Sequence, residues 1–389
     1  MKYAVIGAGA AGLAALRHFA SGTYKDEIVC YEKTEEIGGT WVYREETGLD
    51  RYNLPIHTSM YKSLRTNLPK EVMGFPDFPI PDRPESYLTR NEILQFLNSY
   101  CDHFKLREYI RVSMDRKWSV KVKNLKENVV KTETFDAIMV CNGHYFEPFI
   151  PNLKGQDVFQ GDQLHSHDYR VPAIFKDKTV VVLGAGPSGM DLALEISTSA
   201  KRVILSHHLK ESILTRFPDN VIQCVQLKIC PLNTLFFLLN LFKTAVRKRS
   251  TFPFLSEKCG IRVDSNMVTP LWKHLVSIEN PTLAIVGLPF YVCAFSMFDL
   301  QVYAIFINFT YSEELERRIQ NGLSKRHFHM MGTEQGKYYD DLANTAGITP
   351  LLPVLVKLHN ESSKRFLDDL VHYREDRYRI IDDYNYVQL

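Results

Sequence analysis

Two short glycine-rich segments in this chain have the spacing of a loop that binds phosphate groups. Each reads G-x-G-x-x-G, at residues 7–12 and again at 184–189, and each follows an apolar run rich in β-branched residues, at 3–6 and 180–183. A pyrophosphate needs close approach of the backbone and unpaired N–H groups at the start of a helix. Glycine permits both, because it has no Cβ and tolerates a positive φ. Two such loops predict two bound dinucleotides.

The first loop is followed by a carboxylate at the distance expected of a ribose-binding acid. Gly7 is expected to make the tight turn, Gly9 to let the pyrophosphate approach and Gly12 to let the helix pack on the strand. Glu32 lies about 20 residues beyond Gly12, at the end of the next expected strand, where it would accept hydrogen bonds from a ribose. The expected contacts are Gly7, Gly9, Ala10, Ala11, Gly12 and Glu32.

A second pair of glycines, Gly38 and Gly39, follows Glu32 and leads into Thr40 and Trp41. Such a pair lets the chain fold back over an extended cofactor, an arrangement typical of FAD-binding folds. We therefore expect Gly39, Thr40 and Trp41 to contact FAD. For Trp41, packing in the core is the alternative.

The second loop lacks the acid after its next strand. In its place stand Ser206, His207 and His208, followed by Lys210. A carboxylate there would repel a 2′-phosphate, whereas hydroxyl, imidazole and ammonium groups can bind one, so NADPH is expected rather than NADH. A solvated loop is the alternative for the two histidines. The remaining contacts expected in this fold are Gly184, Gly186, Pro187, Ser188 and Gly189.

Both loops lie within complete βαβ units, which must position them. Helical patterns at about 11–21 and 187–198 are followed by strand patterns at 28–31 and 203–205. The expected fold is therefore α/β, with two Rossmann-like dinucleotide-binding domains of the three-layer ββα architecture.

The order of these units divides the chain into two expected domains. An FAD-binding domain would combine residues 1–170 and 251–389, and an NADPH-binding domain would occupy residues 171–250. The length of 389 residues suits two domains of ordinary size.

Composition excludes several classes of protein. The net charge of +2 gives no reason to expect a nucleic acid partner. Seven cysteines contain no C-x-x-C pair, so neither a metal site nor the redox pair of a flavin disulfide reductase is expected. No secretory signal precedes the first strand, and no apolar run reaches the ~20 residues of a membrane-spanning helix. A cytoplasmic protein is expected, with association with the endoplasmic reticulum as an alternative.

A longer motif, FQGDQLHSHDYR, lies between the two folds at residues 159–170. It matches F-x-G-x-x-x-H-x-x-x-Y at every fixed position and so resembles the fingerprint of the flavin-containing monooxygenases. The related Baeyer–Villiger enzymes end this motif in tryptophan, so Tyr169 favours the amine and sulfide oxygenators. The chain looks similar to insect members of the family, among them the pyrrolizidine-alkaloid N-oxygenases. We expect His165 to help join the domains rather than to act in catalysis, because the motif precedes the second fold.

The resemblance also assigns an active-site segment. Residues 63–71 look like the flavin-facing segment of the family, with Thr66 followed by Asn67 in the place of the active-site asparagine. An asparagine that caps a turn before Pro69 is the alternative. Later, residues 299–302 resemble the return of the chain to the FAD domain, which makes Gln301 a further expected FAD contact.

The chemistry is likewise what the resemblance implies. NADPH reduces FAD, O2 then forms a hydroperoxide at C4a of the flavin, and one oxygen passes to a soft nucleophilic nitrogen or sulfur of a small amine or sulfide. The protein keeps this site dry and holds the reactants. Asn67 is the expected catalytic residue, because its amide supplies donors and an acceptor without a titrating proton.

One segment departs from the family. Its members carry a strand ending in a Thr-Gly-Tyr turn shortly before residues 252–255, and this strand would close the NADPH domain. Residues 224–250 hold no such turn, but an apolar run at 232–242 and then a basic one. A gene-model error, a genuine insertion and a membrane-touching loop are three explanations, and a packed helix would also account for the apolar run. The alternative function is an FAD-binding relative that is non-catalytic or that consumes NADPH without oxygenating a substrate.

Overall fold

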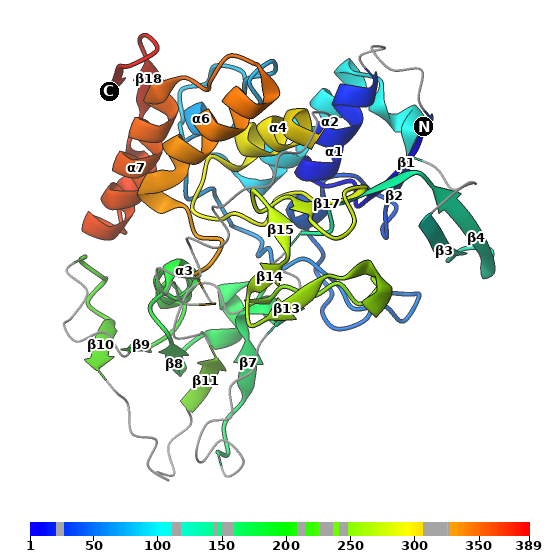
Figure 1. Ribbon diagram of the computed structural model, residues 1–389. Coiled ribbons are helices and arrows are strands. Elements are labelled where there is room, and N and C mark those ends of the chain that lie inside the picture. Colours follow the sequence, from blue (N-terminus) through cyan, green and yellow to red (C-terminus); the bar gives the residue numbers. More distant parts are fainter. Residues whose placement is uncertain are drawn as a thin grey trace.

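The computed structural model describes residues 1–20, 27–110, 118–143, 147–148, 159–207, 215–225, 236–240, 248–305, 325 and 327–389. It has two parts, each built on its own mainly parallel sheet (Figure 1). The larger part carries both ends of the chain. The smaller part, drawn in green at the bottom of Figure 1, contains the second glycine loop.

The first sheet has six strands. In spatial order they are β15 (Leu271–Trp272), β16 (Val276–Ser277), β17 (Leu283–Ile285), β5 (Ala137–Val140), β1 (Lys2–Ile6) and β2 (Glu27–Tyr31). The four strands from β17 to β2 are parallel, and β16 and β15 extend the sheet in antiparallel fashion. The carboxyl ends of the parallel strands therefore meet at one edge, where open α/β sheets bind their ligands.

Helix α1 (Ala10–Ala20) follows β1 after the first glycine loop and packs on the sheet. Leu13 and Leu16 of this helix have no accessible surface, and full burial of a leucine side chain contributes roughly 1.5–3 kcal/mol to stability. On its other side α1 packs against α4 (Ala294–Ile305), where His18 Nε2 lies 2.7 Å from Asp299 Oδ1. The first predicted helix and the strand after it are confirmed, to within a residue or two at their ends.

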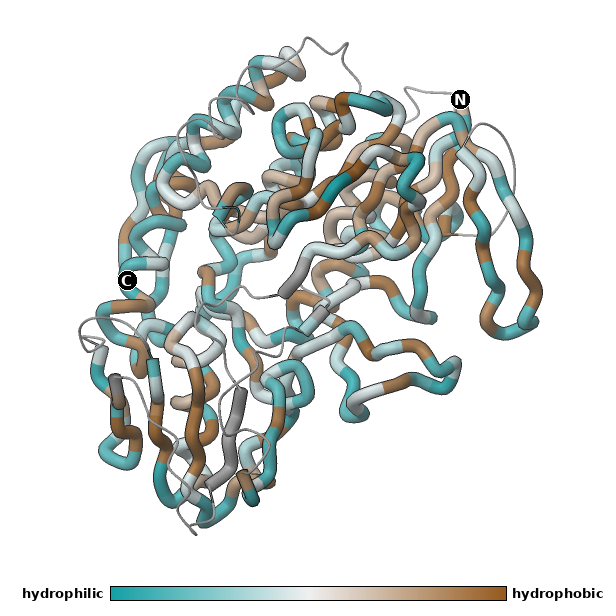
Figure 2. Tube along the Cα trace, turned by 60° about the horizontal axis from the view of Figure 1, so that its bottom comes forward, coloured by the Kyte–Doolittle hydropathy of each residue, from teal (hydrophilic) through white to brown (hydrophobic). Residues whose placement is uncertain are grey.

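The second sheet has five strands, all parallel. In spatial order they are β10 (Val221–Val225), β9 (Arg202–His207), β8 (Thr179–Leu183), β11 (Phe236–Asn240) and β7 (Gln163–His165). Helix α3 (Pro187–Ser197) connects β8 to β9, which confirms the second predicted βαβ unit. Hydrophobic segments run through the middle of this sheet and hydrophilic ones lie at its ends (Figure 2).

Strand β11 changes the interpretation of the atypical segment. The apolar run does not fold as a helix at residues 236–240: it pairs in parallel with β8 on one side and β7 on the other. The packed-helix alternative is therefore wrong for these residues, because the backbone N–H and C=O groups bond to neighbouring strands. β11 supplies the strand whose absence the sequence suggested.

Strand β7 bears on the proposed division into domains. It lies before residue 170, yet it pairs with β11 at the edge of the second sheet. In this structure the second sheet therefore begins a few residues earlier than the boundary expected from the sequence.

The other elements surround the first sheet. Helix α2 (Arg90–His103) begins at a capping box, in which Thr89 N donates to the Glu92 carboxylate at 2.8 Å and Glu92 N donates to Thr89 Oγ1 at 3.3 Å. Helices α6 (Gln335–Ala346) and α7 (Pro353–Asp368) belong to the C-terminal region. Four two-stranded sheets pair β3 (Trp118–Asn124) with β4 (Val129–Phe135), β6 (Glu147–Pro148) with β12 (Lys248–Arg249), β13 (Arg262–Asp264) with β14 (Met267–Thr269), and β18 (Tyr378–Ile380) with β19 (Tyr386–Gln388).

Within the described ranges, none of the helices combines the length and the apolar character that crossing a bilayer requires.

Candidate active site

The first glycine loop joins β1 to α1 through a turn that requires glycine. Gly7 has φ +105°, and its N–H donates to the carbonyl oxygen of Tyr31 at 2.7 Å. A Cβ on Gly12 would lie 2.9 Å from the carbonyl carbon of Gly7 and closer still to its oxygen, so the helix packs directly on the loop. The geometry agrees with the roles expected for both glycines.

The start of α1 offers amide groups to a ligand. The first hydrogen bond of the helix runs from Leu13 N to Gly9 O at 2.9 Å, and its first turn holds no acidic side chain. The N–H groups of Ala10, Ala11 and Gly12 therefore belong to the helix N-terminus, which lacks intrahelical acceptors and carries a partial positive charge. This donor set fits the pyrophosphate of a dinucleotide.

The carboxylate of Glu32 is fixed beside this loop. Its Oε2 accepts from Ala8 N at 2.8 Å, and its Oε1 accepts from the N–H and the hydroxyl of Thr34 at 2.8 and 2.9 Å. Because each carboxylate oxygen has two lone pairs, acceptor capacity remains for a ribose hydroxyl. The predicted position of this acid, at the end of β2 and next to the loop, agrees with the structure.

The second glycine pair folds back onto the first loop, as the sequence predicts. Gly38 N donates to Ala8 O at 3.0 Å, and a Cβ on Gly39 would lie 3.0 Å from the Cα of Gly9. The short 3-10 turn η1 (Gly39–Trp41) follows, with Thr40 exposed. Trp41 is half-buried and packs against the core, and part of its surface stays accessible, so its contact with FAD stays a prediction.

The second glycine loop repeats the geometry of the first. Gly184 has φ +104°, and its N–H donates to Ser206 O at 2.7 Å. Helix α3 begins at Pro187, its N-cap Gly186 makes no side-chain cap, and its first turn, which includes Ser188 and Gly189, holds no acid. A second uncapped helix start therefore lies at the carboxyl edge of the second sheet, where a second pyrophosphate fits.

Two of the residues proposed to bind the 2′-phosphate can be placed. Ser206 and His207 end β9 and are 7% and 3% exposed. Both ring nitrogens of His207 are buried without a hydrogen-bond partner among the described residues. The solvated-loop alternative is therefore wrong for His207. His208 and Lys210 lie outside the described residues, so their role stays a prediction.

Asn67 lies on a bend, and residues on both sides of it form hydrogen bonds with the chain segment before α2. Thr66 N donates to Leu88 O at 2.7 Å, Leu88 N donates to Thr66 Oγ1 at 3.0 Å, and Lys70 N donates to Ser86 O at 2.6 Å. Asn67 itself is exposed, and its amide makes no hydrogen bond to any other part of the chain that the structure describes. The structure thus gives no support to the turn-cap alternative.

Gln301 is placed differently from the expectation. It lies on α4 with no exposed surface, its Oε1 accepts from Gly287 N at 2.9 Å, and its Nε2 donates to Tyr338 OH at 2.8 Å. The amide is thus engaged inside the protein and does not face a ligand site. We correct its expected cofactor contact to a supporting one, in which Gln301 holds the loop that follows β17.

The fingerprint motif is organised around Arg170. This side chain is 6% exposed, and its guanidinium donates to five backbone carbonyls, those of Arg44, Glu46, Thr58, His167 and Tyr169, at 2.6–3.3 Å. Burial lowers the pKa of this arginine from its ordinary value. Hydrogen bonds from one guanidinium therefore connect the segment after the second glycine pair, at residues 44–58, to the motif at residues 159–170.

The histidines of the motif have structural contacts. His165 Nδ1 accepts from His167 N at 3.0 Å, and His167 Nε2 lies 2.9 Å from Ile56 O. Tyr169 is fully buried against Tyr61, with ring centroids 5.4 Å apart. The contact to a distant segment is thus made by His167, that of His165 is local to the motif, and the joining role of His165 stays a prediction.

Five of the six described cysteines are buried free thiols, and Cys224 is partly buried. Burial raises the pKa of Cys101 to about 11 and that of Cys293 to about 12, and it also raises those of Cys30 and Cys141. A thiol is inert when its thiolate is so disfavoured. Among the residues described there is likewise no cluster of side chains able to hold a metal ion.

A family model described as Flavin-binding monooxygenase-like matches residues 1–224, which is more than half of the chain. The chain belongs to this family. It is a flavin-dependent monooxygenase that uses NADPH and O2 to oxygenate nitrogen or sulfur, with FAD and NADPH as cofactors. FAD supplies the redox chemistry that activates O2, and the residues of the first glycine loop fit it. No finding favours the non-catalytic or uncoupled alternative.

Similar proteins match along most of their length. Flavin-containing monooxygenase FMO GS-OX5 of Arabidopsis thaliana is 34% identical, over 90% of this chain and 86% of its own. Senecionine N-oxygenase of Tyria jacobaeae is 30% identical, over 98% of this chain and 90% of its own. The structure of S-allyl-L-cysteine S-oxygenase from Allium sativum superposes with a TM-score of 0.85, at 30% identity, over 96% of this chain and 94% of its own.

Sequence reasoning missed Arg374, which the structure places beside the Asn67 segment. Its Nε donates to Thr66 O at 3.1 Å. No spacing or motif in the C-terminal region marks this arginine, because its partners are distant in sequence.

Proposed function

We propose that this monooxygenase oxygenates the nitrogen of small amines or the sulfur of small sulfides, with Asn67 as its catalytic residue. One similar protein is named for N-oxygenation and another for S-oxygenation, which supports both atoms. The role of Asn67 rests on one observation. Its amide is exposed and makes no hydrogen bond to other described residues, while backbone hydrogen bonds hold the chain on both sides of it.

An amide suits this role because it offers two N–H donors and one acceptor and has no proton to lose near neutral pH. The hydrogen bonds of Thr66 and Lys70 fix the backbone on either side of Asn67, and so the point from which its amide reaches the reacting groups. Asn67 would orient the reacting groups while the rest of the site excludes water.

We also propose the contacts for each cofactor and the domains that supply them. The FAD-binding part would comprise residues 1–170 and 251–389, apart from β7, which joins the second sheet, and the NADPH-binding part would comprise residues 171–250. We propose a cytoplasmic location, because the six described cysteines are free thiols, as is usual in reducing compartments. FAD would be held by Gly7, Gly9, Ala10, Ala11, Gly12, Glu32, Gly39, Thr40, Trp41, Thr66 and Asn67, and NADPH by Gly184, Gly186, Pro187, Ser188, Gly189, Ser206, His207, His208 and Lys210.

Turnover with simple probes tests the substrate class. The purified FAD-containing protein is mixed with NADPH, O2 and either a dialkyl thioether or a tertiary amine, and the N-oxide or sulfoxide is quantified against the NADPH consumed. We expect close to one product per NADPH for at least one probe. NADPH consumption that yields only hydrogen peroxide with both probes would contradict the proposal.

Asn67→Asp tests the site. The substitution keeps size and the preference for a bend but replaces the amide donors with a carboxylate. We expect unchanged FAD content and thermal stability, but on the order of a hundredfold less product per NADPH, as when one preorganised donor is removed. Asn53→Asp is the matched control, because Asn53 is also an exposed asparagine in a turn. Equal product yields from the two variants would show that Asn67 is not catalytic.

A further inference from the structure

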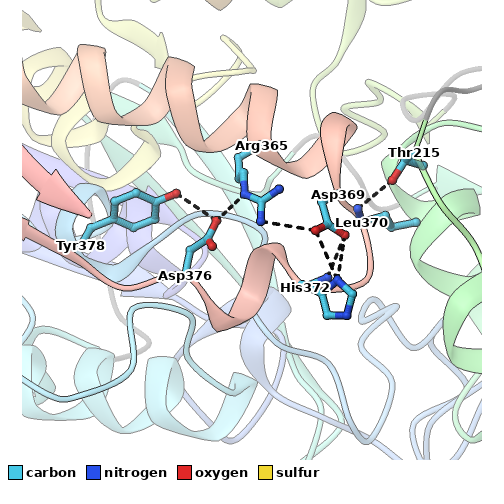
Figure 3. A network of polar contacts seen from close by, with 7 residues as sticks. All are labelled: Thr215, Arg365, Asp369, Leu370, His372, Asp376 and Tyr378. Carbon is cyan, nitrogen blue, oxygen red and sulfur yellow. Dashed lines mark hydrogen bonds and ion pairs between the residues drawn. The ribbon is translucent and has the colours of Figure 1, made fainter. Parts of the chain in front are cut away.

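The C-terminal region contacts parts of the molecule that are distant in the sequence. After α7, Leu370 N donates at 2.7 Å to Oγ1 of Thr215, which lies between β9 and β10 of the second sheet (Figure 3). Thr215 is 2% exposed and Leu370 is fully buried, so this hydrogen bond is shielded from water. The same short segment continues to Arg374.

Arg374 connects α3, the helix that follows the second glycine loop, to the segment at residues 65–67. Its Nη1 donates to Asp191 Oδ1 on α3 at 2.6 Å. Its Nε donates to Thr66 O at 3.1 Å and its Nη2 to Arg65 O at 3.3 Å. Both side chains of the ion pair are mostly buried, at 16% and 15% exposed. A single planar cation therefore bridges α3 and the carbonyl immediately before Asn67.

Asp191 is held on its other side as well. Its Oδ2 accepts a hydrogen bond from the hydroxyl of Tyr61, and Ser63 donates in the same way to Glu195, one turn further along α3. Burial raises the pKa of Tyr61 well above its ordinary value, so this phenol stays protonated and donates. The segment that leads to Asn67 is thus fastened to α3 at several points, with Asp191 at the centre.

The C-terminal segment has its own internal support, separate from this bridge. Arg365 on α7 donates to Asp376 at 2.8 Å and lies 3.4 Å from Asp369, which also accepts from His372 (Figure 3). The contacts of Arg365 connect α7 to the turn that follows it, and they include neither α3 nor the residues next to Asn67. Arg365 therefore offers a matched control, since its ion pairs lie within the C-terminal region.

We propose that Arg374 is a positioning residue of this monooxygenase. By binding both Asp191 on α3 and the carbonyl of Thr66, Arg374 sets the position of Asn67 relative to the helix that binds the second dinucleotide. The inference rests on the proposed role of Asn67. A guanidinium has donors in a fixed fork and can serve a carboxylate and two carbonyls at once. A lysine ammonium keeps the charge but is a compact point on a flexible chain, so it cannot hold all three acceptors in this arrangement.

The test compares Arg374→Lys and Asp191→Asn with the control Arg365→Lys, each as the FAD-containing protein. Four quantities are measured: the Kd for NADP⁺ without turnover, amide hydrogen exchange in a peptide covering residues 61–68, the rate of NADPH consumption, and product formed per NADPH consumed. For Arg374→Lys we expect faster exchange in that peptide and on the order of tenfold less product per NADPH, as for a misplaced reacting group. The rate of NADPH consumption and the Kd for NADP⁺ should change by less than about threefold, or roughly 0.7 kcal/mol.

Asp191→Asn should reproduce the same pattern, which keeps the test valid if one variant folds poorly, and Arg365→Lys should leave product per NADPH at the wild-type value. Unchanged exchange and unchanged product yield in Arg374→Lys would overturn the proposal. So would an equal loss in the Arg365→Lys control, because it would point to general destabilisation. If the wild-type protein makes no oxygenated product, the proposed substrate class fails, while the exchange and NADP⁺ measurements still decide whether Arg374 positions the segment.

Discussion

Gly9 and Gly12 lie in the same loop, but an added methyl group would meet different surroundings at each. On Gly9 a Cβ would lie 3.5 Å from the Cα of Gly39, an ordinary van der Waals contact. On Gly12 it would lie 2.9 Å from the carbonyl carbon of Gly7, a distance at which the backbone must shift. We therefore expect Gly9→Ala to leave the stability of the FAD-free protein within about 1 kcal/mol of wild type. Gly12→Ala should lower it by about 2–3 kcal/mol through overpacking.

The effect of Gly9→Ala should appear in FAD binding instead. The methyl group would occupy the space through which a pyrophosphate approaches the start of α1. Loss of about two amide hydrogen bonds to a charged group, at roughly 1.5–2 kcal/mol each, amounts to about 3–4 kcal/mol. This corresponds to a Kd for FAD on the order of several hundredfold weaker.

Two measurements check this contrast. Titration of the FAD-free protein with FAD, followed by flavin fluorescence, gives the Kd, and urea unfolding of the same preparations gives the free energy of unfolding. The reasoning is refuted if Gly9→Ala binds FAD within about threefold of wild type, or if Gly12→Ala unfolds at the same urea concentration as wild type.

Ser206→Asp should reverse the preference for NADPH over NADH, because a carboxylate at the end of β9 repels a 2′-phosphate and accepts from a ribose; an unchanged ratio of the two KM values would contradict this. Arg170→Ala should lower the free energy of unfolding by about 3–5 kcal/mol, because buried carbonyls lose a shared charged donor, and Arg170→Lys should recover part of the loss. Urea unfolding measures both changes. A loss under about 1 kcal/mol for Arg170→Ala would show that water replaces the donor. Burial lowers the pKa of His359 from its ordinary 6.5. Below pH 6.5 the unfolded chain therefore binds a proton that the folded chain does not, and the free energy of unfolding falls as the pH falls. His359→Gln should flatten this decline in unfolding curves taken between pH 5 and 7, and an equal slope would exclude His359 as a cause.

The cofactor loops could be predicted because their determinants are local. Gly7, Gly12 and Glu32 act through a turn, a helix start and the end of one strand, so their spacing carries the geometry. Asn67 was identified by family resemblance, and the structure adds that its neighbours are pinned while its amide is not engaged by other described residues. Residue type and spacing were sufficient to place the glycine turns and Glu32, while the role of Asn67 stays a proposal.

Other features could not be predicted because they depend on distant contacts. Arg374 lies 308 residues from Thr66, and no periodicity connects two such positions. For Gln301 the resemblance indicated a region of the chain, but it could not show that the amide faces Gly287 and Tyr338. The apolar run at 232–242 was ambiguous for a related reason: periodicity does not separate a buried strand from a short buried helix.

The position of β11 has a consequence for synthesis on the ribosome. β7 lies at the edge of the second sheet with β11 as its neighbour, and β11 also pairs with β8. Both earlier strands leave the ribosome before residue 236 is made, so each presents an unpaired edge for the time needed to translate the intervening chain. Exposed edges of parallel strands make nascent chains prone to aggregation and slow to fold. A chain released between residues 183 and 236 would therefore lack the strand that joins β7 to β8 in the NADPH-binding part.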